Sequence, residues 1–290
     1  MSLTLRDLPD EEFVAPGRSG CPGCAAVIAA RMISKVLGKK TIMVIATGCM
    51  VVNYTYAGAP LFPVIHPLFE NTGSVLSGID CGLRALGRRD GVNLVGLAGD
   101  GGTADIGLQA LSGAVERGHR FLYICYDNEG YMNTGVQRSG TTPFGAVTTT
   151  SPAGERRPMG LRKDMVKIMG AHGIPYAATA TIAYPLDLVR KAKKALAIDG
   201  PTYIHLLTPC WVGWGFPQNF GVKITKLAVQ TGMWILYEVE NGKVTPTVKI
   251  KDRKPVEEYL KAQERFSHLS QEEINRIQQF VDTKCNEFGM

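Results

Sequence analysis

Two polar residues with metal-binding side chains follow two apolar runs near the middle of this 290-residue sequence. Asp100 stands in a Gly-Asp-Gly turn directly after the run 92–98, and Asn128 follows the run 121–126. Short apolar runs that end in such turns are typical of buried parallel strands. Neighbouring parallel strands bring their carboxyl ends to one edge of the sheet, where open α/β folds bind ligands. We therefore expect Asp100 and Asn128 to lie close together.

The chemistry of these residues favours a divalent cation. A carboxylate, an amide oxygen and a loop carbonyl such as that of Gly130 form a set of hard oxygen ligands. Mg²⁺ prefers such ligands and often bridges a protein to phosphate groups. The flanking Gly99 and Gly101 allow the backbone to approach a diphosphate closely. A plain turn between a strand and a helix is the alternative interpretation of the Gly-Asp-Gly sequence.

A second group of residues with possible chemistry consists of cysteines. Four of the seven stand at predicted turns or strand ends: Cys21, Cys24, Cys49 and Cys210. The first two form a CxxC pair before a predicted helix, whose N-terminus favours thiolates. Four thiolates could bind zinc or a [4Fe-4S] cluster, and the sequence chemistry does not separate the two. The remaining three are predicted to be structural: Cys81, Cys125 and Cys285.

The elements that must position these residues alternate between strands and helices. Strands are predicted over 41–46, 92–98, 121–126, 176–181 and 201–209, and helices over 25–37, 69–86, 106–117, 164–169 and 185–198. This alternation predicts an α/β fold with a doubly wound, mostly parallel sheet. Two long segments, 50–67 and 138–162, are predicted to be irregular, and the second is long enough to be a functional loop.

The last part of the chain has a different pattern. A β-hairpin is predicted over 233–248 around an Asn-Gly turn, followed by a polar helical tail over 251–290. We therefore predict a domain over 1–220 that carries the cofactor and cysteine sites. The extension over 221–290 is predicted to pack on partner subunits.

The spacing of Asp100 and Asn128 resembles the thiamine diphosphate-binding motif, which starts with Gly-Asp-Gly and ends in Asn. The segment 131–137 resembles the cofactor loop of pyruvate:ferredoxin oxidoreductases and related 2-oxoacid:ferredoxin oxidoreductases. By position, the resemblance implies that Asp100, Asn128 and Gly130 bind Mg²⁺, and that Asn133 is a catalytic residue near the thiazolium. It also implies a wider set of cofactor-binding residues: Gly99, Gly101, Thr134, Cys49 and Asn71.

The cysteine pattern resembles the proximal-cluster ligands in the beta subunit of that family. A CxxC pair, a Thr-Gly-Cys turn and a distant fourth cysteine each have a match here. The resemblance implies a [4Fe-4S] cluster bound by Cys21, Cys24, Cys49 and Cys210. One position departs from many relatives, because Ala25 stands where they have glycine, which affects local packing and not ligation.

The resemblance implies a beta subunit that takes part in oxidative decarboxylation of a 2-oxoacid, foremost pyruvate, to an acyl-CoA and CO₂. The implied cofactors are thiamine diphosphate, Mg²⁺ and a [4Fe-4S] cluster, with coenzyme A as co-substrate. The implied partners are alpha, gamma and delta subunits, or fused equivalents, and ferredoxin as electron acceptor. Alternative substrates are 2-oxoisovalerate and oxalate. Alternatives of another class are a non-redox thiamine enzyme and a zinc-stabilised scaffold subunit.

The sequence also suggests that the active site is incomplete. Thiamine enzymes need a glutamate that activates the cofactor, and in this family a different subunit or domain supplies it; no residue here is identifiable as that glutamate. His66 and His205 are expected to be structural. Arg138 and Lys163 are candidates for coenzyme A phosphates, with plain solvent exposure as the alternative.

Composition limits the class of protein. With 45% hydrophobic and 20% charged residues, the composition is typical of soluble globular proteins. No apolar run is long enough for a membrane span and the N-terminus is too polar for a signal peptide, so we expect a cytoplasmic protein without a membrane partner. The net charge of +6 suits an acidic protein such as ferredoxin, and the absence of a long basic run argues against nucleic acid.

Overall fold

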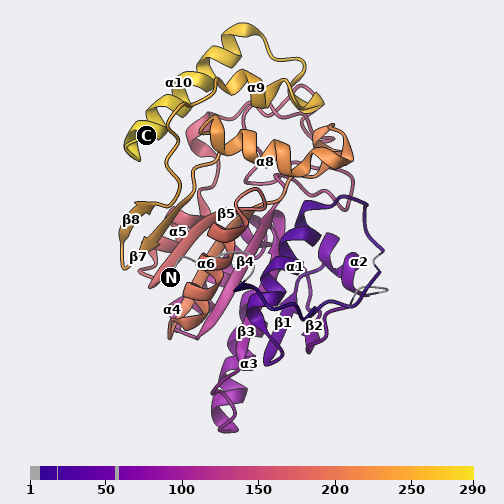
Figure 1. Cartoon of the computed structure of the whole chain (residues 1–290), viewed down its shortest axis with the longest axis vertical. Coiled ribbons are helices and arrows are strands. Elements are labelled where there is room, and N and C mark those ends of the chain that lie inside the picture. The colour runs from indigo at the N-terminus through magenta and orange to yellow at the C-terminus, as the bar shows by residue number, and fades with distance from the viewer. Residues whose placement is uncertain (1–6, 18, 56–58) are drawn as a thin grey trace.

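The computed structural model describes residues 7–17, 19–55 and 59–290. Eight strands form one sheet in the order β2-β1-β3-β4-β6-β5-β7-β8 (Figure 1). Their bounds are β1 Thr41–Ile45, β2 Val64–Ile65, β3 Asn93–Gly99, β4 Phe121–Asp127, β5 Tyr176–Thr181, β6 Pro201–Leu207, β7 Tyr237–Glu240 and β8 Lys243–Pro246. Strands β1 to β6 run parallel, whereas β7 is antiparallel to β5 and β8 is antiparallel to β7. The predicted mostly parallel α/β sheet is confirmed.

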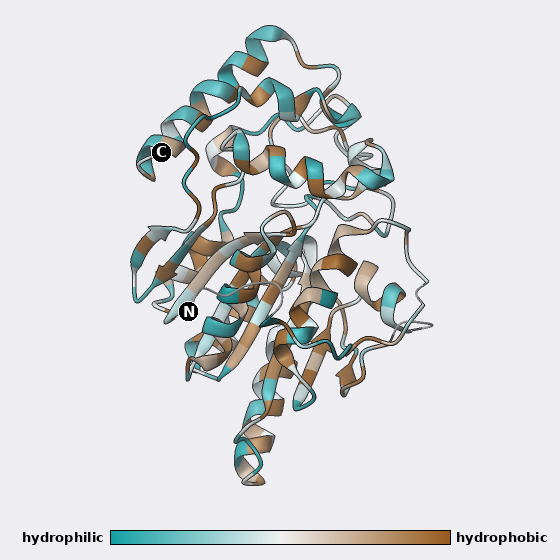
Figure 2. Cartoon of the chain, in the orientation of Figure 1, coloured by the Kyte–Doolittle hydropathy of each residue, from teal (hydrophilic) through white to brown (hydrophobic). Residues whose placement is uncertain are grey.

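Helices cover both faces of this sheet. The main ones are α1 Ala25–Leu37, α3 Thr72–Ala85, α4 Leu108–Glu116, α5 Met165–Ala171 and α6 Pro185–Ala197. Leu122 and Ile124 of β4 pack with α1 and α6, whereas Tyr123 and Cys125 point to the other face and pack with α3, α4 and α5. Two hydrophobic layers therefore enclose the sheet, and Figure 2 shows the hydrophobic colour on the strands and on the inner sides of these helices.

The helices of the C-terminal extension lie at the end of the molecule opposite α3, whereas its hairpin forms the edge of the sheet (Figure 1). It contains α8 Gly221–Gln230, the β7–β8 hairpin, α9 Val256–Leu260 and α10 Gln271–Glu287. The hairpin is confirmed, and both residues of its Asn241-Gly242 turn have the positive φ angles that such a turn requires. Because β7 pairs with β5, the extension continues the sheet. The predicted boundary after residue 220 stays a prediction.

The segment 50–67, predicted to be irregular, contains regular structure. The segment 50–67 includes most of helix α2, Cys49–Thr55, which is anchored by the fully buried Met50. It also includes β2, which pairs with β1; residues 56–58 of this segment, like residues 1–6 of the N-terminal arm, lie outside the described residues. Between β3 and α4 the chain makes a turn of π-helix over Gly101–Asp105. Sequence patterns miss these elements because they are short.

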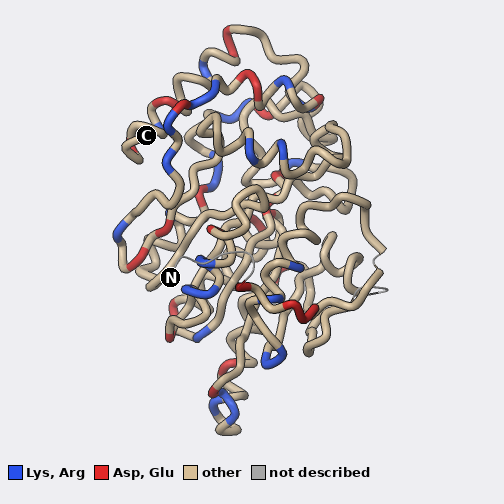
Figure 3. The backbone as a smooth tube through the Cα atoms, viewed as in Figure 1, with Lys and Arg blue, Asp and Glu red and all other residues tan. Residues whose placement is uncertain are grey.

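Charged side chains are mixed along the chain. Figure 3 shows Lys and Arg interspersed with Asp and Glu from α3 to α10. None of the helices in the described part of the chain is sufficiently long and apolar to cross a membrane.

Candidate cofactor and metal sites

Asp100 and Asn128 lie at one edge of the sheet. Strands β3 and β4 are parallel neighbours, and Gly99 is paired with Tyr126, so both residues follow the ends of adjacent strands. The side-chain oxygen of Asn128 lies 3.1 Å from Asp100 Oδ1 and 2.8 Å from the carbonyl oxygen of Gly130. Three oxygens that face one another are stable only with a cation between them, or with the amide turned so that its nitrogen donates to both. This donor set fits a hard divalent cation.

Asp100 is held by two hydroxyl groups. Ser139 Oγ donates a hydrogen bond of 2.5 Å to Asp100 Oδ2. Thr141 Oγ1 lies 3.0 Å from the same oxygen and 2.8 Å from Asp127 Oδ1, so its single proton is shared between the two carboxylates. The other oxygen, Oδ1, is left facing Asn128. Burial, together with the nearby carboxylate of Asp127, raises the pKa of Asp100 well above its usual value. A bound cation would favour the ionised form and offset both effects.

Asp127 is a second buried carboxylate at the same edge. Its Oδ1 accepts a hydrogen bond of 2.8 Å from Thr141 Oγ1, and its Oδ2 lies 2.8 Å from His205 Nε2. Burial acts to raise the pKa of Asp127, but His205, the Arg162 charge and Thr141 outweigh it and hold this pKa below its usual value. His205 Nδ1 lies 2.7 Å from Tyr203 Oη, so both ring nitrogens have partners. His205 therefore supports Asp127.

A cavity of about 140 Å³ lies between the candidate metal ligands Asp100, Asn128 and Gly130, here called the metal edge, and Cys49. Its lining includes eight residues predicted to bind the cofactor: Gly99, Asp100, Gly101, Asn128, Gly130, Asn133, Thr134 and Cys49. It also includes residues to which the sequence analysis assigned no individual role: Thr47, Gly48, Gly102, Phe69, Tyr126, Tyr131 and Met132. Asn71 is outside this lining, and its side-chain oxygen is shielded from water without a hydrogen-bond partner. The cofactor roles of these residues stay predictions.

Glycine is required at position 101 by a close approach. A Cβ atom on Gly101 would lie 2.4 Å from the ring of Tyr131. Tyr131 is fixed in this place because its hydroxyl donates a hydrogen bond of 2.9 Å to Asp105. The glycine therefore allows the aromatic ring to close one side of the cavity.

The structure brings the four predicted cysteines together. Burial raises the pKa of Cys49 to about 12, and the neighbouring Cys24, Cys210 and Cys21 add to this effect. No disulfide bond joins any of the cysteines, all of which lie within the described residues. Within the described residues, no group of three or more His, Cys, Asp or Glu side chains is spaced to bind a single metal ion. The four cysteines are therefore close neighbours without converging on one point.

The CxxC turn is fixed against the segment that follows Cys210. Gly23 has a φ of 73°, and a Cβ atom there would lie 2.5 Å from the carbonyl oxygen of Gln218. Trp211 Nε1 donates a hydrogen bond of 2.9 Å to the carbonyl of Pro22. Ala25, the position that departs from many relatives, is fully buried, so the methyl group is accommodated in the core.

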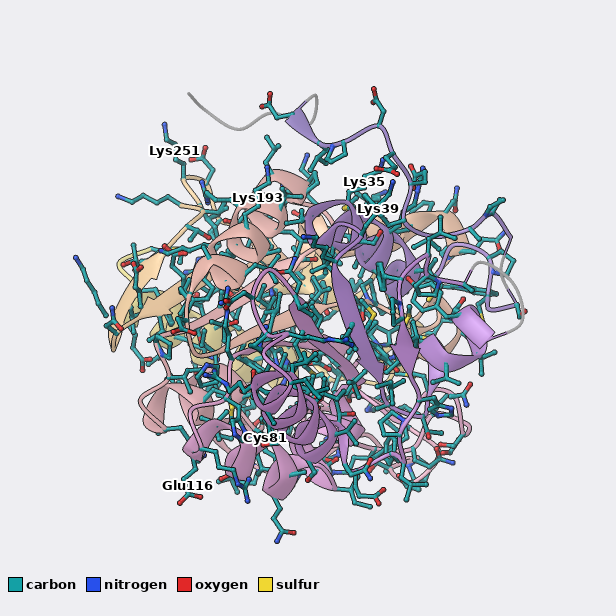
Figure 4. All side chains as sticks on the ribbon, turned by 90° about the horizontal axis from the view of Figure 1, so that it is seen from below. Lys35, Lys39, Cys81, Glu116, Lys193 and Lys251 are labelled. Atoms are coloured by element: carbon teal, nitrogen blue, oxygen red, sulfur yellow. The ribbon has the colours of Figure 1, made fainter. Side chains whose placement is uncertain are left out.

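The other residues considered from the sequence have protein partners. Arg138 pairs with Glu155, and Lys163 pairs with Asp105. His66 Nε2 lies 3.0 Å from Thr47 Oγ1, at the rim of the cavity. Of the three cysteines predicted to be structural, Cys125 and Cys285 are buried and Cys81 is exposed. Figure 4, which views the molecule from below, labels Cys81, a residue of α3.

Comparison with known proteins identifies relatives over almost the whole chain. Residues 46–206 match the family described as thiamine pyrophosphate enzyme, C-terminal TPP binding domain. Pyruvate synthase subunit PorB of Methanothermobacter thermautotrophicus is 56% identical over 287 residues, which cover 97% of this chain and 98% of the relative. Ketoisovalerate oxidoreductase subunit VorB of Pyrococcus furiosus is 49% identical over 288 residues, which cover 94% and 91%.

A solved structure supports the fold. The 2-oxoglutarate:ferredoxin oxidoreductase from Magnetococcus marinus, solved with 2-oxoglutarate, coenzyme A and succinyl-CoA bound, aligns with a TM-score of 0.59. The alignment covers 70% of this chain and 69% of that chain at 21% sequence identity. At this identity the likeness concerns the fold alone.

Proposed function

The chain belongs to the family of the PorB subunits of pyruvate synthase, and we propose that it is the thiamine diphosphate-binding beta subunit of a pyruvate:ferredoxin oxidoreductase. The enzyme would convert pyruvate and coenzyme A to acetyl-CoA and CO₂, with two electrons passed to ferredoxin. The observation that carries this proposal is the position of Cys49. It lines the cavity that contains the metal edge, and it also belongs to the four-cysteine group.

The proposal assigns a role to each group of residues. Asp100, Asn128 and Gly130 bind Mg²⁺ and, through it, the diphosphate. Gly99 and Gly101 allow the backbone to approach the phosphates. Four further residues are proposed to lie near the reactive part of the cofactor: Asn133, Thr134, Cys49 and Asn71. The cluster ligands are Cys21, Cys24, Cys49 and Cys210.

The cofactors supply the reaction chemistry and the chain positions them. Thiamine diphosphate provides a carbon nucleophile and electron sink for decarboxylation, and a [4Fe-4S] cluster accepts electrons one at a time. The chain's own contribution is to hold the metal edge, to line the cavity with Tyr131 and Met132, and to place Cys49 beside it.

Pyruvate is the preferred substrate because the 56% identical relative is named a pyruvate synthase subunit. The VorB relative, at 49% identity, favours 2-oxoisovalerate as the second candidate. The family names describe subunits, so we propose that partner subunits complete the active site and supply the activating glutamate. A cytoplasmic location is part of this proposal.

The test uses the assembled enzyme purified without oxygen, with ferredoxin reduction followed after addition of pyruvate and coenzyme A. We expect Cys49→Ser to lose ferredoxin reduction while it still binds thiamine diphosphate. Cys81→Ser is the matched control, because this exposed cysteine lies outside the four-cysteine group, and it should retain the activity. Decarboxylation without ferredoxin reduction in the wild type would instead favour a non-redox thiamine enzyme. Zinc in place of iron, with no turnover, would favour a scaffold subunit.

A further inference from the structure

We propose that Arg265, in the C-terminal extension, is a positioning residue for the metal-binding turn over 128–130. It would act by holding Glu129, the central residue of the turn, in an unfavourable backbone conformation. This inference rests on the proposed function, because it takes Asn128 and Gly130 as metal ligands. The inference gives the C-terminal extension a role in metal binding, although Arg265 lies far from the turn in the sequence.

Glu129 has a backbone conformation that few residues with a side chain adopt. Its φ angle is 64°, in the left-handed region that favours glycine. It lies between Asn128 and Gly130, and the side-chain amide of Asn128 approaches the carbonyl oxygen of Gly130 to 2.8 Å. The conformation of Glu129 therefore sets the relative position of two of the three oxygens in the donor set. Such a conformation persists only where the surrounding structure holds it.

The contacts of Glu129 supply that restraint. Its side chain is 2% exposed, and its two carboxylate oxygens pair with different arginines, Arg265 at 2.6 Å and Arg162 at 2.7 Å. Its backbone N–H donates a hydrogen bond of 2.8 Å to Asp127, and its carbonyl accepts one of 2.8 Å from Thr142. Each polar group of Glu129 is thus fixed in place.

Arg265 restrains the same turn by a second route. Its guanidinium lies over the ring of Trp214, 3.6 Å from the ring centre. Trp214 is fully buried and donates a hydrogen bond of 2.7 Å to the carbonyl oxygen of Asn128. One guanidinium therefore contacts both the side chain of Glu129 and the ring that holds the backbone of Asn128.

Arg265 acts at a distance from the cavity. It is 5% exposed and is not part of the cavity lining, so it would touch neither metal nor cofactor. Its own position is fixed by Gln263, which accepts a hydrogen bond of 3.0 Å from Arg265 Nε, and by Val147, whose N–H donates to the Arg265 carbonyl. The arginine thus connects the extension and the loop 138–162 to the metal-binding turn.

The first test measures metal affinity in the assembled enzyme with full-length chains. Mn²⁺ replaces Mg²⁺ as the probe at saturating thiamine diphosphate, and free Mn²⁺ is followed by electron paramagnetic resonance. We expect Arg265→Gln to raise the Mn²⁺ dissociation constant by about 10- to 100-fold, the range typical for loss of a residue that orients a metal ligand. Arg265→Lys, which keeps the charge but not the planar stacking group, should have an intermediate effect.

The control is Arg253→Gln, which removes another arginine of the extension that pairs with Asp282 instead of Glu129. It should leave the dissociation constant unchanged. Equal Mn²⁺ affinity in wild type and Arg265→Gln would overturn the inference. An inability of the wild type to bind Mn²⁺ with thiamine diphosphate would instead overturn the metal assignment on which the inference rests, so the two failures are distinguishable.

The second test separates positioning from general stabilisation. Glu129→Gly and Glu129→Ala are compared in the Arg265→Gln background, since both remove the carboxylate but only glycine adopts a φ of 64° without strain. We expect the glycine variant to bind Mn²⁺ at least about tenfold more tightly than the alanine variant. Equal affinities would show that Arg265 does not act through the conformation of Glu129, and would overturn the inference.

Discussion

The metal edge and the four-cysteine group adjoin one cavity but are built differently. Asp100 is 1% exposed and Asn128 is 6% exposed, and both follow adjacent strands of the same sheet. The cysteines come from three segments far apart in sequence, and Cys21 is exposed. Side chains with hydroxyl, imidazole and guanidinium groups bond to the carboxylates at and beside the metal edge. The CxxC turn is instead held by contacts such as the hydrogen bond from Trp211 to the Pro22 carbonyl.

This difference indicates how each site depends on its metal. A site supported by buried hydrogen bonds is ordered before its ligand arrives, which lowers the entropic cost of binding. A site assembled from separate segments gains much of its order from the metal, because metal binding and folding are coupled there. We therefore expect removal of Mg²⁺ to leave the metal edge intact, and removal of a cluster to loosen the CxxC turn.

The largest expected effect is that of Asp100→Asn. Loss of a direct charged ligand should weaken Mn²⁺ binding by more than about 100-fold, since loss of a supporting residue already costs about 10- to 100-fold. The metal-free variant should remain folded, because burial raises the pKa of Asp100 and a neutral amide of the same shape avoids the cost of a buried charge. Mn²⁺ titration and thermal unfolding measure the two effects. Unchanged Mn²⁺ affinity would remove Asp100 from the donor set.

Cys49→Ser tests whether the two sites are separable. We expect the iron content of the assembled enzyme to fall by most of one cluster per chain, because a hydroxyl is a poor replacement for a thiolate ligand. Mn²⁺ affinity at saturating thiamine diphosphate should change by less than about tenfold, since the oxygen ligands remain. Iron analysis and Mn²⁺ titration of the same preparation give both values. Full iron content in this variant would exclude Cys49 as a ligand.

Hydrogen exchange after iron removal tests the proposed difference in order. Chelation of iron should accelerate amide exchange over 21–24 by at least about tenfold, which corresponds to about 1.4 kcal/mol in local opening free energy. Exchange over 127–130 should stay unchanged, because hydrogen bonds to protein groups hold that turn. Mass spectrometry of peptides from both regions provides the comparison. Equal acceleration in the two regions would contradict it.

Ser139→Ala should have the smallest effect. It removes one of two hydroxyl donors to Asp100 Oδ2, and Thr141 remains, so we expect a loss in Mn²⁺ affinity of about tenfold, the lower end for a supporting residue. Ser151→Ala, in the same loop, is the control because Ser151 bonds to Thr148 through its backbone, which the substitution keeps, and is not a donor to Asp100. A loss as large as that of Asp100→Asn would mean that the metal edge is less well supported than its contacts indicate.

The sequence predicted the parts of the site that strand order determines. Asp100 and Asn128 each follow an apolar run, and parallel pairing of such runs leaves few arrangements for their ends. The four cysteines could be grouped from the sequence because thiols at turns are rare, and their role as cluster ligands stays a prediction. Both predictions depend on residue types, such as Asp and Cys, that take part in few kinds of binding chemistry.

The supporting residues could not be predicted, because tertiary contacts determine their positions. Ser139 and Thr141 belong to a loop whose length signalled function, but no periodic pattern indicates which hydroxyls face Asp100. Arg265 is 136 positions from Glu129, and no sequence pattern indicates that the Asp127 carboxylate meets His205. Helix α2 was missed because seven residues give too short a periodic signal.

The most direct test of an electron path from the cavity through Cys49 is a rapid-freeze electron paramagnetic resonance measurement. The assembled enzyme, loaded with thiamine diphosphate, is mixed with pyruvate in the absence of ferredoxin. We predict a reduced [4Fe-4S] signal within the turnover time, lost in Asp100→Asn although dithionite still reduces its cluster. Decarboxylation of pyruvate by wild-type enzyme without any reduced-cluster signal would contradict the account.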